Sequence, residues 1–414
     1  MTPKGTRPGE RPDGPNRPKS AADYLLRNAG RIASRRVDID EAEEWASALQ
    51  IMFRPVGEET EPDLDASDLL AEAGRRGGTA AAVLSAALAV FGPPECRGAA
   101  RDQTRRLIEN GAWVPAWAEA LGDVVPQRAM LLTDVWEDDY LVLVDFVRPD
   151  GAVCAVGVHV DLVLEGVAHH FVRGPSAEAI IDEGGSPDGA VVRPVSLTDA
   201  RAMIDAGMEL RDLSDLPEVS DEDDECYRLD EGLRPLVEQR IGLLPSGGDA
   251  SRPRPLTKRQ MVRTVRRVAA RSKSLDRADV ERLADRIALF GEYCNDRDPL
   301  RWSPRKTHAF LAEWIPWKTV PDADEHDAIE AVFPHWIEYA AESRGLDAER
   351  LALNLSAAQA SFADMRANAA DPAMRSPVAN LFCEMREDGV DLSDADAVEA
   401  WLDRFLARAR SEGR

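Results

Sequence analysis

The chain has 414 residues, of which 44% are hydrophobic, and its formal net charge is −24. This hydrophobic share is enough to build sizeable cores and excludes global disorder, and the length predicts two or three domains. The negative charge opposes the binding of nucleic-acid backbones and anionic membranes over most of the surface. A nucleic-acid role would therefore require a local basic patch.

The five cysteines are widely spaced, and no CxxC motif occurs in the sequence. This pattern predicts reduced thiols in a cytoplasmic protein, and neither a disulfide framework, a metal site nor a bound cofactor. Residues 1–19 alternate Pro, Gly, Lys and Arg without an apolar core, which predicts a disordered tail and no signal peptide. The most apolar stretch, residues 79–91, is too short to span a bilayer, so we expect a buried helix there and no membrane association.

Helical periodicity dominates the first structured region, residues 20–122. Ser20 and Asp23 resemble a capping box that begins a helix. Three more helices are predicted over residues 65–74, 79–91 and 99–110.

The period changes in the middle of the chain, where Val, Leu and aromatic residues alternate with turn residues. Strands are predicted over residues 131–136, 140–147, 153–164 and 167–172. Residues 148–151 read Arg-Pro-Asp-Gly and predict a turn, and residues 165–166 predict a second, two-residue turn. We therefore expect a meander of three or four antiparallel strands with helices on at least one face.

A helix is predicted over residues 196–213, followed by an acidic stretch. Beyond the linker the chain is predicted to be helical, with a capped helix start at Ser303 and Pro304 and a new helix at Pro334. The predicted fold class is α+β, mainly α-helical with a small central antiparallel β-meander. The predicted parts are a disordered tail (1–19), a helical region with the meander (20–242), a linker rich in Pro, Gly and Ser (243–255) and an all-helical domain (256–414).

Two sequence blocks resemble an uncharacterised protein family common in high-GC bacterial genomes. The first block is the meander segment 158–171, which reads VHVDLVLEGVAHHF, and the second is PLRWSP at 299–304 followed by FLAEWIP at 310–316. The resemblance covers about residues 113–345 and implies an architecture, but no activity. Asp161 stands at the first of the family's two meander aspartates, and His170 occupies the second position. If that pair is catalytic in the family, the resemblance implies an altered or inactive member.

A polar cluster on the meander is the candidate catalytic site. Residues two apart on a strand face the same side, so His159 and Asp161 share a face. With a two-residue turn at 165–166, His170 would lie opposite Asp161, with Cβ atoms about 5 Å apart. An Asp that orients an imidazole suits a general base, and two His with one carboxylate can bind a metal. The alternative, a cross-strand pair that only fixes the register, is favoured because no nucleophile accompanies the cluster.

A basic run over residues 251–274 carries nine Lys or Arg residues and no acidic residue. The predicted helix within it, residues 252–273, could bind phosphates or a partner through Arg259, Arg263, Arg266 and Arg267. It could also contact the chain's own acidic stretch, residues 209–231, or remain solvated. Charge complementarity favours the intramolecular contact, but the sequence does not decide whether the two segments meet.

Aromatic residues between 302 and 339 recur at helical spacing, which is typical of a core. Trp314 and Trp317 are the candidates for a partner-binding surface if their polar edges are exposed.

The sequence therefore favours a cytoplasmic, non-enzymatic interaction or regulatory protein, with another protein or a second copy as its partner. A hydrolase or metal-dependent enzyme that uses Asp161, His159 and His170 is the first alternative. A nucleic-acid accessory factor that uses the basic helix is the second alternative.

Overall fold

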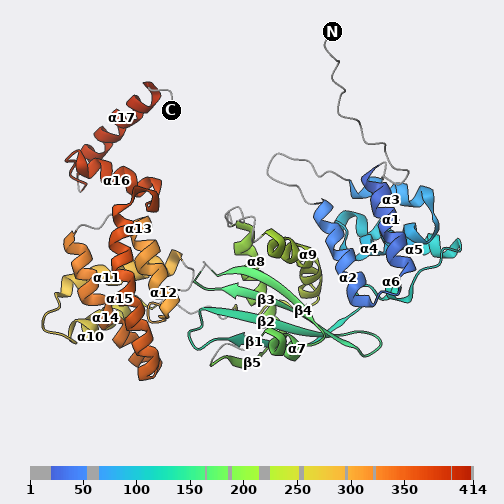
Figure 1. Cartoon of the computed structure of the whole chain (residues 1–414), viewed down its shortest axis with the longest axis horizontal. Coiled ribbons are helices and arrows are strands. Elements are labelled where there is room, and N and C mark those ends of the chain that lie inside the picture. The colour runs from blue at the N-terminus through green and yellow to red at the C-terminus, as the bar shows by residue number, and fades with distance from the viewer. Residues whose placement is uncertain are drawn as a thin grey trace, which may run out of the picture.

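A computed structural model of the chain describes residues 20–53, 65–163, 166–184, 189–213, 224–250, 256–293, 297–319, 323–392 and 394–411. It is mainly helical and contains one five-stranded antiparallel sheet (Figure 1). The predicted fold class is therefore confirmed. The predicted disordered tail, residues 1–19, lies outside the described residues.

The N-terminal region is a helical unit. Its helices are α1 (Ala21–Ser34), α2 (Ile39–Ala48), η1 (Leu49–Phe53), α3 (Ala66–Arg76), α4 (Gly78–Phe91), α5 (Pro94–Glu109) and α6 (Ala116–Ala120). The Ser20 hydroxyl accepts a hydrogen bond from the Asp23 N–H at 3.2 Å, which is half of the predicted capping box. α4 is buried along almost its whole length, as its apolar sequence predicts, and it packs against α1 and α5.

The sheet comes next along the chain and contains the predicted strands and one strand that was not predicted. Its strands are β1 (Val125–Thr133), β2 (Asp139–Val147), β3 (Val153–Asp161), β4 (Val167–Gly174) and β5 (Val191–Val195), arranged β4-β3-β2-β1-β5. The sequence did not predict β5, which has five residues, is largely exposed and contains Pro194. Proline is tolerated at the edge of a sheet, where one side of the strand makes no ladder hydrogen bonds. Such a strand lacks the alternation that a half-buried strand shows.

Helices cover both faces of the sheet, as Figure 1 shows. One face carries the buried Val142, Val144 and Phe146 and belongs to the same core as the N-terminal helices, α8 (Leu197–Leu213) and α9 (Asp224–Ile241). The other face carries the buried Leu143 and Ala155. It packs against the short helix α7 (Ala177–Gly184). The expectation of a helical layer on at least one face is confirmed.

The connection from β3 to β4 is longer than predicted. Asp161 pairs with Val167, so five residues separate the paired ends, and the predicted two-residue turn is wrong. One Asp161 carboxylate oxygen accepts the Val163 N–H at 2.8 Å, and the Asp161 carbonyl accepts the Gly166 N–H at 2.8 Å. This local hydrogen bonding of an aspartate ends the strand, although apolar residues follow it.

The C-terminal region is all helical. Its elements are α10 (Lys258–Ala269), α11 (Arg277–Tyr293), α12 (Pro304–His308), the π-helix η2 (Ala309–Trp314), α13 (Ile315–Lys318), α14 (Ala323–Arg344), α15 (Ala348–Ala370), η3 (Pro372–Met374), α16 (Pro377–Glu387) and α17 (Ala395–Ser411). The Ser303 hydroxyl accepts the Lys306 N–H at 2.8 Å, so the predicted cap of α12 is confirmed. A second core, separate from the first, includes Phe290, Trp302 and Phe333.

The sequence predicted that Pro334 begins a new helix, and this prediction is wrong. Pro334 lies inside α14. Proline removes one backbone hydrogen bond from a helix interior. The neighbouring Phe333, Trp336 and Ile337 are fully buried in the second core. This tertiary packing keeps the helix continuous, because burial of an apolar face stabilises a helix more than local propensity does.

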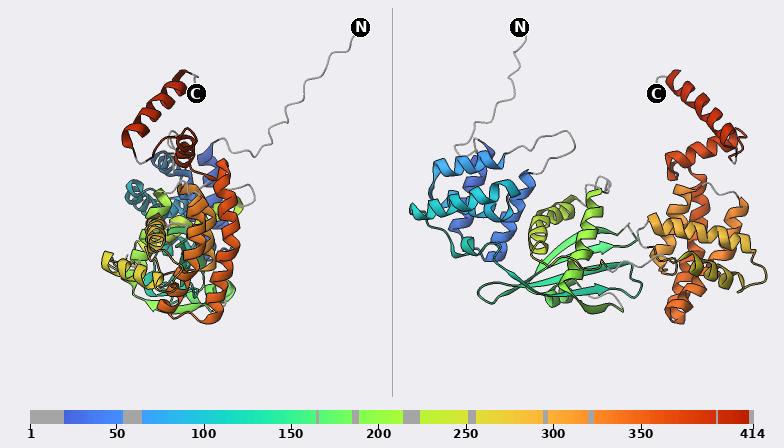
Figure 2. Two further views of the ribbon diagram at one scale, coloured as in Figure 1. Left: turned by 90° about the vertical axis from the view of Figure 1, so that its left-hand side faces the viewer. Right: turned by 180° about the vertical axis from the view of Figure 1, so that it is seen from behind.

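The sheet lies between the N-terminal and C-terminal helical regions, and α16 and α17 project from the C-terminal region (Figure 2). The part of the predicted linker that the structure describes, residues 243–250, contains neither helix nor strand. None of the helices in the described ranges combines the length and the apolar composition that a membrane span needs.

Candidate functional site

Helix α10 turns a row of cationic side chains outward. A capping box starts the helix, because the Thr257 hydroxyl accepts the Gln260 N–H at 3.3 Å and the Gln260 side chain accepts the Thr257 N–H at 2.8 Å. Val265 and Val268 are buried on the inner side. The outer side forms a shallow depression of about 550 Å³, which we call the α10 face. It is lined by Lys258, Arg259, Val262, Arg263 and Arg266.

The four cations of the α10 face make no ion pair and no side-chain hydrogen bond with the rest of the described chain. All four are exposed, and Val262 between them is 39% exposed. Arg267, the remaining predicted residue, lies beside this face, and one of its guanidinium nitrogens donates to the Tyr339 hydroxyl at 3.4 Å. The structure therefore groups three of the four predicted arginines in one depression and gives the fourth a contact within the chain.

Arg271, directly beyond α10, behaves differently. Its guanidinium donates to both oxygens of Glu342, at 2.9 and 2.7 Å, and to Glu338 at 3.3 Å. These bonds attach the end of α10 to α14. Arg271 is therefore paired with carboxylates of its own chain, whereas the four cations of the α10 face are not.

The predicted contact between the basic run 252–273 and the acidic stretch 209–231 falls largely outside the described residues. Residues 214–223 are not described, and neither are the side chains of residues 224–231. Within the described part of the acidic stretch, Asp212 pairs with Arg234 at 2.5 Å. The contact itself therefore remains a prediction.

The two candidate tryptophans lie in different environments. Trp314 is only 6% exposed, and its ring lies 5.6 Å from the Phe290 ring and 5.8 Å from the Phe310 ring. It is a core residue, so its predicted role as a partner contact is wrong. Trp317 is 40% exposed on α13 and remains available to a partner.

The sheet brings the candidate catalytic residues together differently from the prediction. Because the connection from β3 to β4 is longer than predicted, Val167 lies opposite Asp161, and a bulge in β4 then places His170 opposite His159. The His159 and His170 rings stack with centroids 6.3 Å apart. The Asp161 carboxylate accepts a hydrogen bond from Arg305 of α12. Asp161 therefore links the sheet to the C-terminal helices.

The carboxylate that orients His159 is Asp139, which the sequence did not single out. The His159 Nε2 lies 3.4 Å from an Asp139 oxygen. This hydrogen bond outweighs the effect of burial and lowers the pKa of Asp139 below its ordinary value. A carboxylate–imidazole pair of this kind can orient a general base. Among the residues described, no group of three or more His, Cys, Asp or Glu side chains is positioned to hold a metal ion.

The PLRWSP block, residues 299–304, forms a junction between the sheet and the C-terminal helices. The buried Arg301 guanidinium donates to the Trp136 and Glu137 carbonyls at 3.2 and 2.7 Å, and to an Asp138 oxygen at 2.7 Å. Trp302 fills the second core, and its indole N–H donates to the Pro299 carbonyl at 2.9 Å. Burial raises the pKa of Asp138, although Arg301 opposes this shift. The block that carries the family resemblance thus has a structural role.

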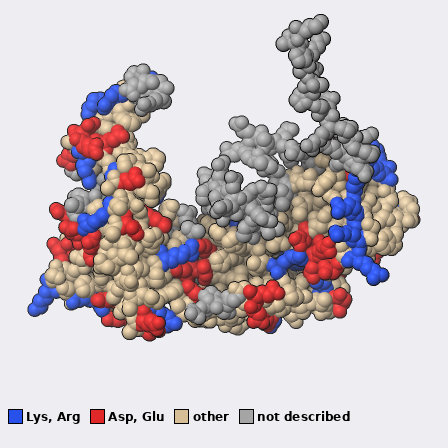
Figure 3. Space-filling model, in the orientation of Figure 1, with Lys and Arg blue, Asp and Glu red and all other residues tan. Residues whose placement is uncertain are grey.

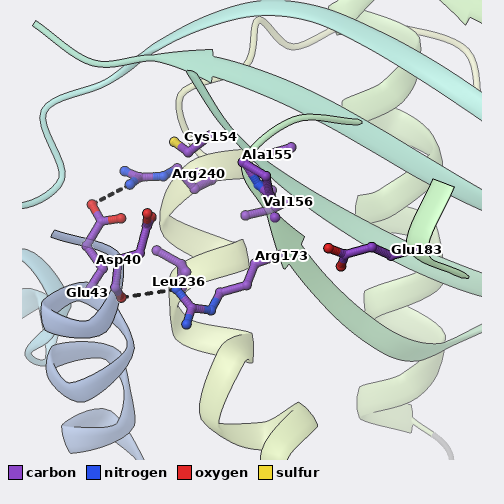
Figure 4. A pocket seen from close by; sticks show the side chains of 11 residues that line it. Asp40, Glu43, Cys154, Ala155, Val156, Arg173, Glu183, Leu236 and Arg240 are labelled. Carbon is purple, nitrogen blue, oxygen red and sulfur yellow. Dashed lines mark hydrogen bonds and ion pairs between the residues drawn. The ribbon is translucent and has the colours of Figure 1, made fainter. Parts of the chain in front are cut away.

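A charged pocket of about 260 Å³ lies between α2, the strands β3 and β4, and α9 (Figure 4). One wall holds the buried Glu43, which pairs with Arg148 at 3.1 Å and also with Arg240. Asp40 pairs with the same Arg148 at 2.6 Å. We call Asp40, Glu43, Arg148 and Arg240 the Glu43 cluster. Opposite charges are matched within it, so it holds α2 against the sheet and α9.

Cys154 also lines this pocket. Burial raises the pKa of its thiol above the ordinary value, against the opposing effect of Arg148 and Arg240. The thiol is therefore protonated at neutral pH and is a poor nucleophile. Cys154 is a free thiol, as are Cys96 and Cys383, the other cysteines whose side chains are described.

Comparisons of the chain with protein-family models, with curated proteins and with solved structures found no match. The resemblance to an uncharacterised bacterial family therefore remains a prediction.

Sequence analysis missed Asp139, Asp138 and the Glu43 cluster. Asp138 lies in the turn before β2, and Asp139 is the first residue of that strand. Acidic residues are common at such positions, so nothing in the sequence marked the two aspartates as functional. Glu43 lies at a helical position whose neighbours in the chain are also acidic. Its burial is set by Arg148 and Arg240, which are 105 and 197 residues away in the chain. The one available signal was the position of Glu43 between Ala42 and Ala46, two small residues that are fully buried.

Proposed function

We propose that this protein is a cytoplasmic, non-enzymatic interaction protein that binds an acidic surface of a protein partner through the α10 face. The observation that carries the proposal is the group of four exposed cations without a partner in the described chain. In Figure 3 Asp and Glu side chains form separate patches on the surface in view, and Lys and Arg side chains form a band over the N-terminal helices and smaller patches elsewhere. A basic face on an acidic protein steers an oppositely charged partner and fixes its orientation.

The chemistry of the face favours a protein over a nucleic acid. The net charge of −24 repels a phosphate backbone that extends beyond α10. Val262, in the centre of the face, offers a small apolar contact of the kind found inside protein interfaces. The free thiols of Cys96 and Cys154 support a reducing compartment.

The test uses the full-length protein isolated gently from its own host and analysed by native mass spectrometry. We expect a protein to co-purify with the wild-type chain and to be lost when the four cations of the α10 face, Lys258, Arg259, Arg263 and Arg266, are all replaced by Ala. A matched control replaces four exposed arginines elsewhere by Ala. These are Arg101, Arg105, Arg106 and Arg193.

The control variant should retain the partner, and binding should weaken as salt is raised. Equal loss in both variants would show that bulk charge, and not the α10 face, is responsible. Bound nucleic acid that is lost only from the α10 variant would favour the accessory-factor alternative. A wild-type chain that carries no partner would contradict the proposal.

A second candidate function, a hydrolase that uses a general base on the sheet, is supported by the 3.4 Å approach of His159 to Asp139. An activity screen against ester, amide and phosphoester substrates tests it. Activity that is abolished by His159→Gln and retained by His335→Gln, at a histidine of α14 that also pairs with a carboxylate, would support this candidate. The absence of activity in the wild-type chain would contradict it.

A further inference from the structure

The arginines of the basic run recur at every fourth residue. Four of them form a single row along α10 and just beyond its end: Arg259, Arg263, Arg267 and Arg271. Because an α-helix has 3.6 residues per turn, such a row winds slowly around the helix. It begins on the exposed α10 face and ends against the neighbouring helix α14 (Figure 1). The same row is therefore exposed at its start and covered at its end.

The covered end shows which kind of surface this chain places against the row. Arg271 donates to Glu338 and Glu342, which stand four residues apart on α14. Between these two glutamates lies Tyr339, whose hydroxyl accepts a hydrogen bond from Arg267 at 3.4 Å. Residues three and four apart lie on one side of a helix. The cover is thus one face of a helix that presents two carboxylates.

The start of the row has no such cover. Arg259 and Arg263 are exposed, and no described residue pairs with them. Lys258, Val262 and Arg266 lie beside them on the α10 face. The first turn of α10 contains no acidic residue. Positive side chains are unfavourable there, because the macrodipole already makes the start of a helix positive. This end of α10 therefore attracts carboxylates.

We propose that the partner covers the α10 face with an acidic helix, whose carboxylates stand four residues apart and which places a small apolar residue against Val262. This inference rests on the proposed function and names the surface that the partner presents. The precedent is α14, which covers the end of the same row in this way.

The geometry of two facing helices supports this occupant. Side chains four residues apart on a helix repeat at about 6 Å, so arginines on one helix and carboxylates on the other can pair at several positions at once. A disordered acidic tail would lose more conformational freedom on binding than a helix that is already formed. The α10 face therefore fits a helix better than a tail of equal charge.

The test measures the binding of two labelled peptides to the full-length protein by fluorescence anisotropy at low ionic strength. Each peptide is an Ala-rich helix of about 20 residues, and circular dichroism verifies its helicity. The aligned peptide carries its Glu residues four apart on one face. The distributed peptide has the same composition, with its Glu residues placed around the helix. We expect the aligned peptide to bind about tenfold more tightly or better, because only its carboxylates can meet the row together.

Variants of the protein locate the contact. The variant in which Ala replaces the four cations of the α10 face should lose the preference for the aligned peptide. The control variant, with Ala at four exposed arginines elsewhere, should keep it. Arg263→Glu should weaken binding of the aligned peptide and strengthen binding of an aligned peptide whose central Glu is replaced by Lys. This reversal would show that the two helices meet in a defined register.

Three results would overturn the proposal. Equal binding of the two peptides would show that acidic charge alone is enough. An aligned peptide that does not bind would show that the face does not take an acidic helix. A DNA duplex that binds more tightly than the aligned peptide, through the same four cations, would assign the face to nucleic acid. Co-purification of a protein partner does not depend on the peptides, so the proposed function and this inference can fail separately.

Discussion

The Glu43 cluster and the α10 face both depend on arginine but place it in opposite environments. Arg240 is 1% exposed and Arg148 is 6% exposed, and both are paired with Glu43. On α10, Arg259, Arg263 and Arg266 are exposed and have no partner in the described chain. A buried guanidinium needs a carboxylate because an uncompensated charge in the interior is costly, whereas water stabilises an exposed one. The matched arginines therefore hold the fold together, and the unmatched ones are free to bind.

The largest effect should come from Glu43→Gln. This change leaves two buried guanidinium groups without their shared carboxylate and should lower the free energy of unfolding by about 3–5 kcal/mol. Urea denaturation followed by circular dichroism measures the loss. Glu44→Gln is the neighbouring control, because Glu44 is half exposed where it pairs with Arg173, and it should cost about 1 kcal/mol or less. Equal losses in the free energy of unfolding for the two variants would show that a buried arginine pair stabilises the fold no more than an exposed pair does.

Arg301→Ala tests the second buried arginine, at the junction of sheet and helices. It leaves the Asp138 carboxylate and two backbone carbonyls without their donor and should cost about 3 kcal/mol. Arg305→Ala, at a side chain that is 47% exposed and pairs with Asp161, should cost about 1 kcal/mol or less. Urea denaturation of both variants measures the difference.

The cost of Arg301→Ala should also depend on pH. Burial raises the pKa of Asp138, so the folded chain holds this proton to a higher pH than the unfolded chain does. In that window the native state binds more protons, and stability falls as the pH rises. Without Arg301 the Asp138 pKa rises further. The loss of stability should then be smaller in mildly acidic solution than at neutral pH, and a loss that is independent of pH would argue against a buried carboxylate.

The His159–Asp139 pair is intermediate in exposure between the buried Glu43 cluster and the exposed α10 face, since both side chains are about one third exposed. The His159 hydrogen bond lowers the pKa of Asp139, so it adds stability above the unfolded pKa that is lost as the pH falls through the folded value. We expect His159→Gln to raise the pKa of Asp139 toward its ordinary value. An NMR titration of the Asp139 carboxyl measures this, and an unchanged pKa would show that His159 does not hold the carboxylate.

The smallest effect should be that of Arg263→Ala on stability. Its side chain has no partner in the described chain, so the free energy of unfolding should change by no more than about 0.5 kcal/mol. Arg271→Ala removes the bonds to Glu338 and Glu342 and should cost about 1 kcal/mol. Thermal unfolding of both variants compares them directly. A large loss at Arg263 would mean that the α10 face is occupied within the chain.

The sequence predicted the features that local chemistry controls. Caps at Ser20 and Ser303 and the buried helix α4 were found from their own residues, and the strands β2 and β3 from their Val, Leu and aromatic residues between turn residues. The outward row of arginines on α10 was also visible, because a helical period separates it from Val265 and Val268. These features need only the residues within a few turns or one strand.

The tertiary structure decided which charges are paired and which side chains are buried. Glu43, Arg148 and Arg240 come from distant parts of the chain, so no local pattern shows that they share one interior site. Likewise, the longer connection from β3 to β4, together with the bulge in β4, placed His170 opposite His159 instead of Asp161, and the second core covered Trp314 while leaving Trp317 exposed. The length of a connection fixes the register of the two strands that it joins, and local alternation does not show that length. Periodicity therefore determined the elements of this protein, and the long-range packing determined its sites.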